Sequence, residues 1–167
     1  ESLRIGGSHF EEGIVRYVKR VYNLAIGDRT AEDIKTSIAS AFPSPDQTVT
    51  IRGRDLVTGL PATLEISSVD IYPALEEPIN SIVDAIRAVL EVTPPELAAD
   101  IVNKGMSLTG GGALLEGMAR LIQDQTGVPV TLAEDPLSCV ARGTGEILDQ
   151  LDKVSPSSLV ASYTKAR

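Results

Sequence analysis

The chain has 167 residues, of which 43% are apolar, and a formal net charge of −8. A chain of this length and composition can bury a core of its own, so we expect a globular protein. The negative charge argues against a nucleic-acid partner, because binding to phosphates requires clustered lysine and arginine side chains. Cys139 is the only cysteine, which excludes an internal disulfide framework and suits a reducing compartment.

The sequence shows neither a membrane span nor an N-terminal signal peptide. No stretch approaches the roughly 18 apolar residues of a membrane span, and residues 1–25 lack the pattern of a signal peptide. We therefore expect a cytoplasmic location. Residues 1–7 are typical of the end of a strand, with no turn before them. From this we expect further sequence upstream.

The first predicted helix begins at Ser8. Ser8 and Glu11 have the spacing of a capping box, in which each side chain binds the backbone amide of the other. His9 lies beside this cap without a nucleophile motif elsewhere, so we interpret it as a surface residue. The apolar residues that follow at helical spacing are Phe10, Ile14, Val18, Val21 and Tyr22.

A second predicted helix begins at Thr30. It carries Ile34, Ile38 and Ala41 on its inner face and ends before Pro43. Glu32 and Lys35 share a face of this helix. From the residues alone we interpret them as a solvated ion pair that contributes about 0.2–0.5 kcal/mol.

Residues 48–66 alternate apolar and polar side chains around a turn at 58–61, which predicts a β-hairpin. Ser67 and Asp70 then cap a long helix. The apolar residues of that helix are Ile71, Leu75, Ile79, Ile82, Ile86 and Leu90. Residues 8–92 are therefore expected to form a helix-rich unit that carries a hairpin.

Residues 93–152 predict helix, strand, helix, strand and helix. The first helix is expected to start within residues 93–96 with a proline at its first position, the second to end at Gly127, and the third to start at Asp135. Two strands cannot cover three helices. We therefore expect residues 2–5, and strands outside this chain, to complete the layer.

Residues 106–118 run from a short apolar strand through three glycines into a helical pattern that includes Leu114 and Leu115. Gly110, Gly111 and Gly112 can adopt positive φ and let a flat or anionic group approach the backbone. A turn in which strand and helix pass closely is an equally good interpretation. The sequence contains neither a P-loop nor the G-x-G-x-x-G dinucleotide motif.

Catalytic and metal sites find no support in the residues. One histidine and one cysteine cannot form a zinc site, and the carboxylates lack the spacing of a calcium loop. Glu134 and Asp135 precede Pro136 and are better interpreted as helix-capping residues than as an acid–base pair. We therefore predict no catalytic residue and no metal ligand in this chain.

Seven strings, in order, resemble the bacterial actin homologue MreB, and the resemblance covers about residues 2–152. The hairpin string at 52–61 is the most specific, since the glycine string alone would suit the wider actin, Hsp70 and sugar-kinase superfamily. The strings are 2–7 (SLRIGG), 14–18 (IVRYV), 27–32 (GDRTAE), 52–61 (RGRDLVTGLP), 94–100 (PPELAAD), 108–115 (LTGGGALL) and 133–145 (AEDPLSCVARGTG).

The resemblance implies an α/β fold, the second half of an actin-like protein. Residues 1–7 and 93–152 would form its inner, ribonuclease-H-like subdomain, incomplete at the N-terminus. Residues 8–92 would form a small α+β outer subdomain with the hairpin at 48–66, and residues 153–167 a flexible tail.

The resemblance also implies the site. Residues 109–113 would be the adenosine motif, and the second predicted helix would flank the adenosine from the other side, which replaces the surface-pair interpretation of Glu32 and Lys35. The nucleotide-binding residues implied are Glu32, Asp33, Ile34, Lys35, Gly110, Gly111, Gly112 and Ala113.

The resemblance implies that an intact protein has two such halves, which close on ATP or ADP with Mg²⁺. The phosphate-binding hairpins and the catalytic carboxylates would belong to segments that precede this chain. Phosphoryl transfer depends on that electrostatic clamp. We therefore expect the chain alone to hydrolyse no ATP and to bind nucleotide weakly or not at all.

The resemblance implies a piece of a nucleotide-controlled filament protein that maintains bacterial rod shape and guides cell-wall synthesis at the inner face of the membrane. The implied partners are other subunits, a membrane-anchored helix-turn-helix adaptor and the cell-wall elongation machinery, with membrane attachment through the first half and no nucleic acid. The alternatives are half of a sugar-kinase-like phosphotransferase and a stand-alone interaction module.

Overall fold

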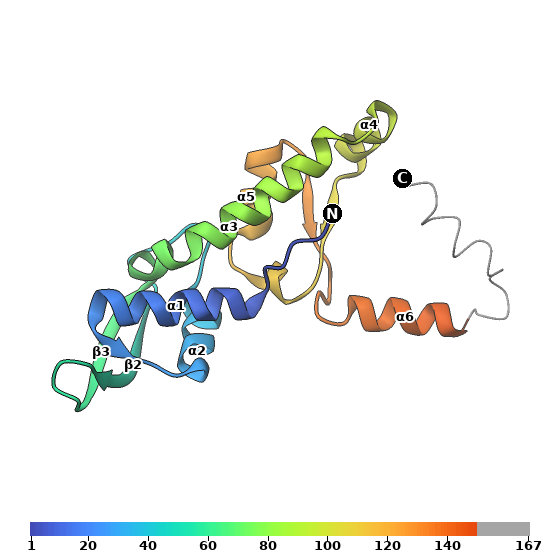
Figure 1. Ribbon diagram of the computed structural model, residues 1–167. Helices are drawn as coiled ribbons and strands as arrows, with labels where there is room; N and C mark the ends of the chain where they lie inside the picture. The colour runs from blue at the N-terminus through green and yellow to red at the C-terminus, as the bar shows by residue number, and fades with distance from the viewer. Residues whose placement is uncertain (150–167) are drawn as a thin grey trace.

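A computed structural model describes residues 1–149 of the chain (Figure 1). Its helices are α1 (Gly7–Tyr22), α2 (Asp28–Ile38), α3 (Ser68–Glu91), α4 (Pro95–Lys104), the 3₁₀ turn η1 (Gly111–Leu114), α5 (Met118–Thr126) and α6 (Cys139–Asp149). Its strands are β1 (Leu24–Ala25), β2 (Thr48–Asp55), β3 (Pro61–Ser67), β4 (Met106–Leu108) and β5 (Val130–Leu132). The expected tail at 153–167 and the end of the last predicted helix lie outside the described residues.

Helix α3 joins the two ends of the molecule. In Figure 1 it runs diagonally from the β2–β3 hairpin at one end to α4 at the other. Helices α1 and α2 and an antiparallel sheet ordered β1-β2-β3 gather at the hairpin end. The parallel pair β4–β5 and helix α5 lie beside the other half of α3. The fold is α/β, as predicted.

The core is concentrated at the hairpin end, where one face of each helix meets the sheet. It extends to Met118 and Ile122 of α5, so it crosses the predicted boundary near residue 92. That boundary stays a prediction. The largest fully buried side chains are Ile14, Ile34, Ile66, Ile71, Leu75, Ile79 and Ile122.

The start of α1 differs from the prediction. The helix begins at Gly7 after Gly6, and the Gly6 amide donates to Nδ1 of His9 at 3.2 Å. The expected capping box of Ser8 and Glu11 is therefore wrong, because the helix starts earlier and His9 occupies the capping position. Val21, expected inside, is 46% exposed.

Helix α2 also starts earlier than expected, at Asp28 after Gly27, and it ends at Ile38. Ile34 and Ile38 are buried as predicted. Ala41 is buried too, but it lies beyond the helix, in a bend. Helix α2 therefore ends well before Pro43, so the predicted termination of the helix by the prolines is wrong.

The predicted hairpin is confirmed, with Ile51 opposite Leu64 in an antiparallel register. The prediction missed a third strand, β1, which pairs with the other edge of β2. Gly53 marks the close approach, because a Cβ atom there would lie 2.4 Å from the carbonyl oxygen of Ala25. A glycine inside a strand is the sequence signal that could have indicated this neighbour.

The capping box at the start of α3 is confirmed. The Ser67 amide donates to Oδ2 of Asp70 at 2.8 Å, and the Asp70 amide donates to Oγ of Ser67 at 3.3 Å. Hydrogen bonds from the Ser67 hydroxyl and amide lower the pKa of Asp70. The reciprocal bonds satisfy two amides that a helix start leaves free.

Helices α1 and α3 approach closely at a proline. Pro78 has no amide hydrogen, so the carbonyl of Ala74 one turn earlier lacks its helical donor. Gly13 of α1 packs there, and a Cβ atom on it would lie 2.9 Å from that carbonyl oxygen. A small residue in α1 therefore permits the approach of the two helices.

Beyond α3 the elements bury little of their surface. Helix α4 begins with Pro95, which confirms the predicted helix start with a proline at its first position, and α5 is capped by Gly127 as predicted. Helix α5 begins only at Met118, and Leu114 belongs to the separate 3₁₀ turn η1, so the predicted continuous helix with Leu114 and Met118 on one side is wrong; the Leu114 side chain is 53% exposed. Helix α6 begins at Cys139 rather than at Asp135.

None of the helices formed by residues 1–149 is both long enough and apolar enough to cross a membrane.

Candidate functional site

Helix α2 presents the first candidate segment. Glu32 and Asp33 are exposed on its surface, whereas the Ile34 side chain is completely buried in the core. Only the backbone of Ile34 could therefore meet a ligand. The Thr36 hydroxyl donates to the backbone carbonyl of Glu32 at 2.9 Å, so this hydrogen bond does not involve the Glu32 carboxylate.

Lys35 has a partner that the sequence did not indicate. Its ammonium forms a partly buried ion pair with Glu11 of α1, and both side chains are about a fifth to a quarter exposed. The interpretation of Glu32 and Lys35 as a solvated pair is wrong, because α1 supplies the carboxylate. A Cβ atom on Gly7 would lie 3.2 Å from the Lys35 nitrogen. Lys35 therefore ties α2 to the start of α1.

The second candidate segment is the glycine turn. Gly110 has a φ of +82°, a conformation that favours glycine. Its amide donates to the carbonyl of Pro136 at 2.8 Å, and its own carbonyl accepts from the Ala113 amide at 3.1 Å. Gly111 and Gly112 follow in the 3₁₀ turn η1, and the Ala113 side chain is buried. These bonds fix the turn at the end of strand β4.

The space around the glycines separates the two interpretations of the turn. A Cβ atom on Gly112 would meet nothing within 4 Å, and one on Gly111 would make only an ordinary contact of 3.4 Å with Leu137. Neither residue has the positive φ that requires glycine. Close packing within residues 1–149 therefore does not explain these two glycines, and the backbone at Gly112 is open to an incoming group.

The two candidate segments are joined behind the turn. The Ala41 amide, three residues after α2, donates to the carbonyl of Glu116 at 2.8 Å, two residues after η1. Ser40 and Glu116 form a parallel bridge, and the Gln47 amide group donates to the Glu116 carboxylate at 2.8 Å. These bonds couple the position of α2 to that of the glycine turn.

Two further side chains seal this junction. The Phe42 ring lies against Gly117, where a Cβ atom would come within 2.6 Å of it, and the Arg120 guanidinium lies over the ring, 4.7 Å from its centroid. Gly117 also has a φ of +76°. The junction therefore requires glycine at this position.

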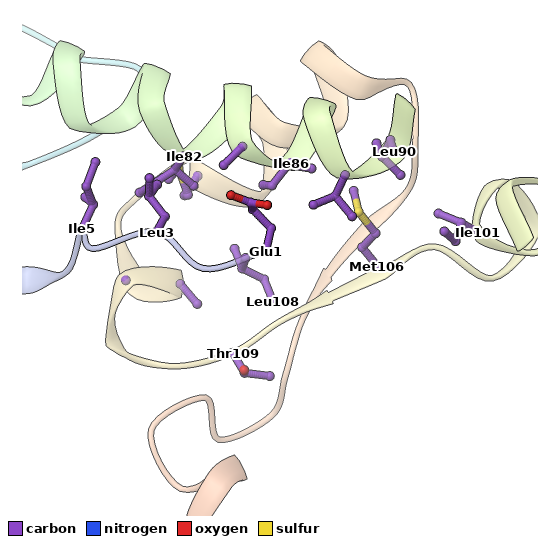
Figure 2. Close-up of a pocket in the computed structure, with 15 residues that line it drawn as sticks. Glu1, Leu3, Ile5, Ile82, Ile86, Leu90, Ile101, Met106, Leu108 and Thr109 are labelled. Atoms are coloured by element: carbon purple, nitrogen blue, oxygen red, sulfur yellow. The ribbon is translucent and has the colours of Figure 1, made fainter. Parts of the chain in front are cut away.

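A cavity of about 490 Å³ opens on the β4 side of the turn (Figure 2). In Figure 2, Ile82, Ile86 and Leu90 extend from α3 toward Met106 and Leu108 of β4. Thr109, Gly112 and Ala113 line its end, but none of residues 32–35 does. Most of its wall is apolar, which is typical of a surface that a further layer of sheet would cover.

The described residues do not gather metal ligands. Within 1–149, no three histidine, cysteine, aspartate or glutamate side chains converge on one point. The donor set therefore does not fit Mg²⁺, and we derive no role for a metal here. The arrangement consists of an open glycine backbone coupled to a helix with exposed carboxylates, which is suited to binding a ligand.

Comparison with known proteins places these segments in one family. The family model for MreB/Mbl protein matches residues 1–156. The chain is 48% identical to the cell shape-determining protein Mbl of Bacillus subtilis (strain 168), over 95% of this chain and 48% of that protein. It is 50% identical to the cell shape-determining protein MreB of Escherichia coli (strain K12), over 90% of this chain and 44% of that protein.

A solved structure agrees. The crystal structure of MreB5 of Spiroplasma citri bound to ADP superposes with a TM-score of 0.87 at 38% identity, over 92% of this chain and 47% of that one. The chain thus spans about half the length of the relatives it matches. The matches do not favour a sugar-kinase-like phosphotransferase. The chain belongs to the MreB/Mbl family of actin-like, cell shape-determining proteins.

Proposed function

We propose that this chain supplies the adenosine side of a nucleotide site in an MreB-like, filament-forming cytoskeletal protein. Gly110, Gly111, Gly112 and Ala113 would lie beside the purine and sugar, and Glu32, Asp33, Ile34 and Lys35 would flank them from α2. The observation that carries the proposal is the open backbone at Gly112, which no packing within residues 1–149 explains.

The chemistry of the residues supports an adenosine ligand. A glycine turn without Cβ atoms lets a flat ring lie against the backbone. The Glu32 carboxylate is exposed and could accept hydrogen bonds from ribose hydroxyls, as acidic residues do in other nucleotide sites. Lys35 is held by Glu11, so we assign it to positioning α2 rather than to contact with phosphate.

The identity of the nucleotide is inferred from the relatives. MreB5 of Spiroplasma citri has been solved bound to ADP and bound to AMPPNP. We propose that the intact protein binds ATP or ADP with Mg²⁺, and that the phosphate and metal contacts come from outside this chain. Alone, this chain would hydrolyse no ATP, since residues 1–149 contain no metal-ligand cluster.

The wider role follows from the family. The relatives Mbl and MreB are named as cell shape-determining proteins. We propose that the intact protein assembles into filaments in the cytoplasm at the inner face of the membrane, guides cell-wall synthesis, and meets a membrane-anchored adaptor and the elongation machinery. Attachment to the membrane would come from the first half of the intact protein.

A valine at Gly112 tests the adenosine site. A Cβ atom at this position meets nothing within 4 Å, so we expect folding to be retained while a ligand on that backbone would be displaced. For the full-length gene product, we expect the affinity for a fluorescent AMPPNP analogue to fall at least tenfold, measured by fluorescence anisotropy. The 167-residue chain alone should bind the analogue much more weakly and show no ATP turnover.

The matched control is Gly143→Ala in α6, where the added methyl group also meets nothing within 4 Å. It should leave the affinity unchanged. If Gly112→Val retained the affinity of the original protein, with an unchanged circular dichroism spectrum, the adenosine assignment would be wrong.

A further inference from the structure

Gln47 lies between α2 and β2 and contacts two further segments of the chain. Its side-chain amide donates to Oε2 of Glu116 at 2.8 Å, although the two residues are 69 positions apart. Its backbone carbonyl accepts a hydrogen bond from the amide of Ser68, the first residue of α3, at 2.8 Å. The next residue, Thr48, begins β2. Gln47 therefore joins the segment after the glycine turn to the sheet and to the start of α3.

The oxygen of the Gln47 side chain has no donor. Its Oε1 atom is buried, and no hydrogen-bond partner within residues 1–149 reaches it. A buried polar atom without a partner is unfavourable, so such an atom in a folded protein requires an explanation. Turning the amide group over would bring Oε1 against the Glu116 carboxylate, and the hydrogen bond would be lost. The bond to Glu116 therefore fixes the orientation of the amide, although Oε1 stays unpaired.

The Glu116 carboxylate has no cationic partner in the part of the chain that the structure describes. Its hydrogen bond with Gln47 is assisted by charge, and such bonds are stronger than those between neutral groups. The backbone carbonyl of Glu116 accepts separately, from the Ala41 amide at 2.8 Å and from the Ser40 hydroxyl at 3.4 Å. A change of the Glu116 side chain therefore leaves these backbone contacts available.

The bond between the two side chains lies close to both segments of the proposed adenosine site. The Gly112 carbonyl accepts from the Leu115 amide at 3.3 Å, and Glu116 is the next residue. On the other side, α2 ends at Ile38, two residues before the buried Ser40. A shift in this bond would therefore move the glycine turn relative to α2.

We propose that Gln47 and Glu116 are positioning residues for the adenosine site. Their hydrogen bond holds the glycine turn and α2 at the separation that a purine and its ribose require. A ligand that enters between preset segments binds more tightly than one that must first order them. The inference rests on the proposed adenosine site and extends it to two residues outside 32–35 and 110–113.

A swap of the two side chains tests the proposal in the full-length gene product. In Q47E two carboxylates face each other, so we expect the affinity for the fluorescent AMPPNP analogue to fall by about fivefold or more. In E116Q the Gln47 amide still finds an oxygen acceptor, and the affinity should stay within about twofold. In Q47E/E116Q the donor and the acceptor exchange places, so the affinity should return to within about threefold of the original value. Fluorescence anisotropy measures all three variants.

N80D is the matched control, because it makes the same change from amide to carboxylate at an exposed position on α3. It should bind the analogue like the unaltered protein. Circular dichroism at the assay temperature checks that each variant is folded. If Q47E does not fold, E116A takes its place, since it removes the acceptor while the backbone bonds of residue 116 remain, and it should lose affinity by a similar factor.

Three results would overturn the positioning role. The first is a lower unfolding midpoint in Q47E with unchanged affinity, which indicates a purely structural contact. The second is a swap variant that binds as weakly as Q47E, because the pair would then not act as a unit. The third is full affinity in both Q47E and E116A. If Gly112→Val still loses affinity in that case, the adenosine site stands without the positioning role, whereas full affinity in Gly112→Val would overturn both.

Discussion

The two ends of this molecule differ in how they use apolar residues. At the hairpin end, α1, α2, α3 and the three-stranded sheet bury side chains such as Ile14 and Leu75 completely. At the other end, α4 and α6 bury none of their described residues, and Val140 is 74% exposed. The first region buries its apolar side chains within itself, whereas the second has apolar side chains that no other part of residues 1–149 covers.

The difference explains where the candidate site lies. The glycine turn sits where the complete region meets the incomplete one, joined to α2 through Ala41 and Glu116. The closed core holds α2 and the turn in place, while the cavity beside Thr109 remains uncovered. A binding site on rigid elements with one open side is suited to a ligand enclosed by another lobe.

The largest effect should come from emptying the closed core. Leu75→Ala should lower the free energy of unfolding by about 2–5 kcal/mol, because the side chain is fully buried in α3. Leu148→Ala in α6 removes the same atoms from a side chain that is 60% exposed and should change stability by less than about 0.5 kcal/mol. Urea unfolding of both variants measures the contrast, and equal losses would contradict it.

Smaller changes in the free energy of unfolding, opposite in sign to each other, are expected at two glycines. Gly53→Ala should destabilise by roughly 1–3 kcal/mol, because the added methyl group would collide with the Ala25 carbonyl. Gly143→Ala meets free space in α6 and should instead favour that helix by up to about 1 kcal/mol. Thermal unfolding followed by circular dichroism distinguishes the two signs.

The smallest effect concerns helix caps. Asp70→Asn should cost about 1 kcal/mol at pH 7, because α3 would lose part of its capping box. Helix α4 follows Pro94 and has no side-chain cap to lose.

The pH dependence has a definite sign. The pKa of Asp70 is lowered in the folded protein, so its contribution is present above the unfolded pKa of about 3.9 and is lost as pH falls through the lower folded value. Stability measured between pH 7 and pH 2 should therefore decline less in Asp70→Asn than in the unaltered chain. Parallel curves would show that the cap contributes nothing.

Much of the fold was predictable from local patterns. The alternation in 48–66 predicted the hairpin, Ser67 and Asp70 predicted the start of α3, and the prolines within 93–96 predicted the start of α4. Each of these signals depends on residues a few positions apart. The candidate site residues came from the family resemblance, because glycines alone could not separate a ligand turn from a packing turn.

The errors have a common cause. Glu11 has the spacing of a cap residue, yet it pairs with Lys35, which is 24 positions away in the sequence. Strand β1 has only two residues and is defined by its partner β2 rather than by its own pattern. In both cases the deciding contact is made by a residue or strand that is distant in the sequence, so local spacing could not indicate it.

The sequence by itself determined the α/β class, the order of the main helices and strands, and the family to which the chain belongs. Only the tertiary structure decided that Lys35 is bound to Glu11, that α2 is tied to the glycine turn through Glu116, and that Gly112 is open. The physical reason is range. Periodicity and caps act within one turn or one strand, whereas these contacts exist only after packing brings distant segments together.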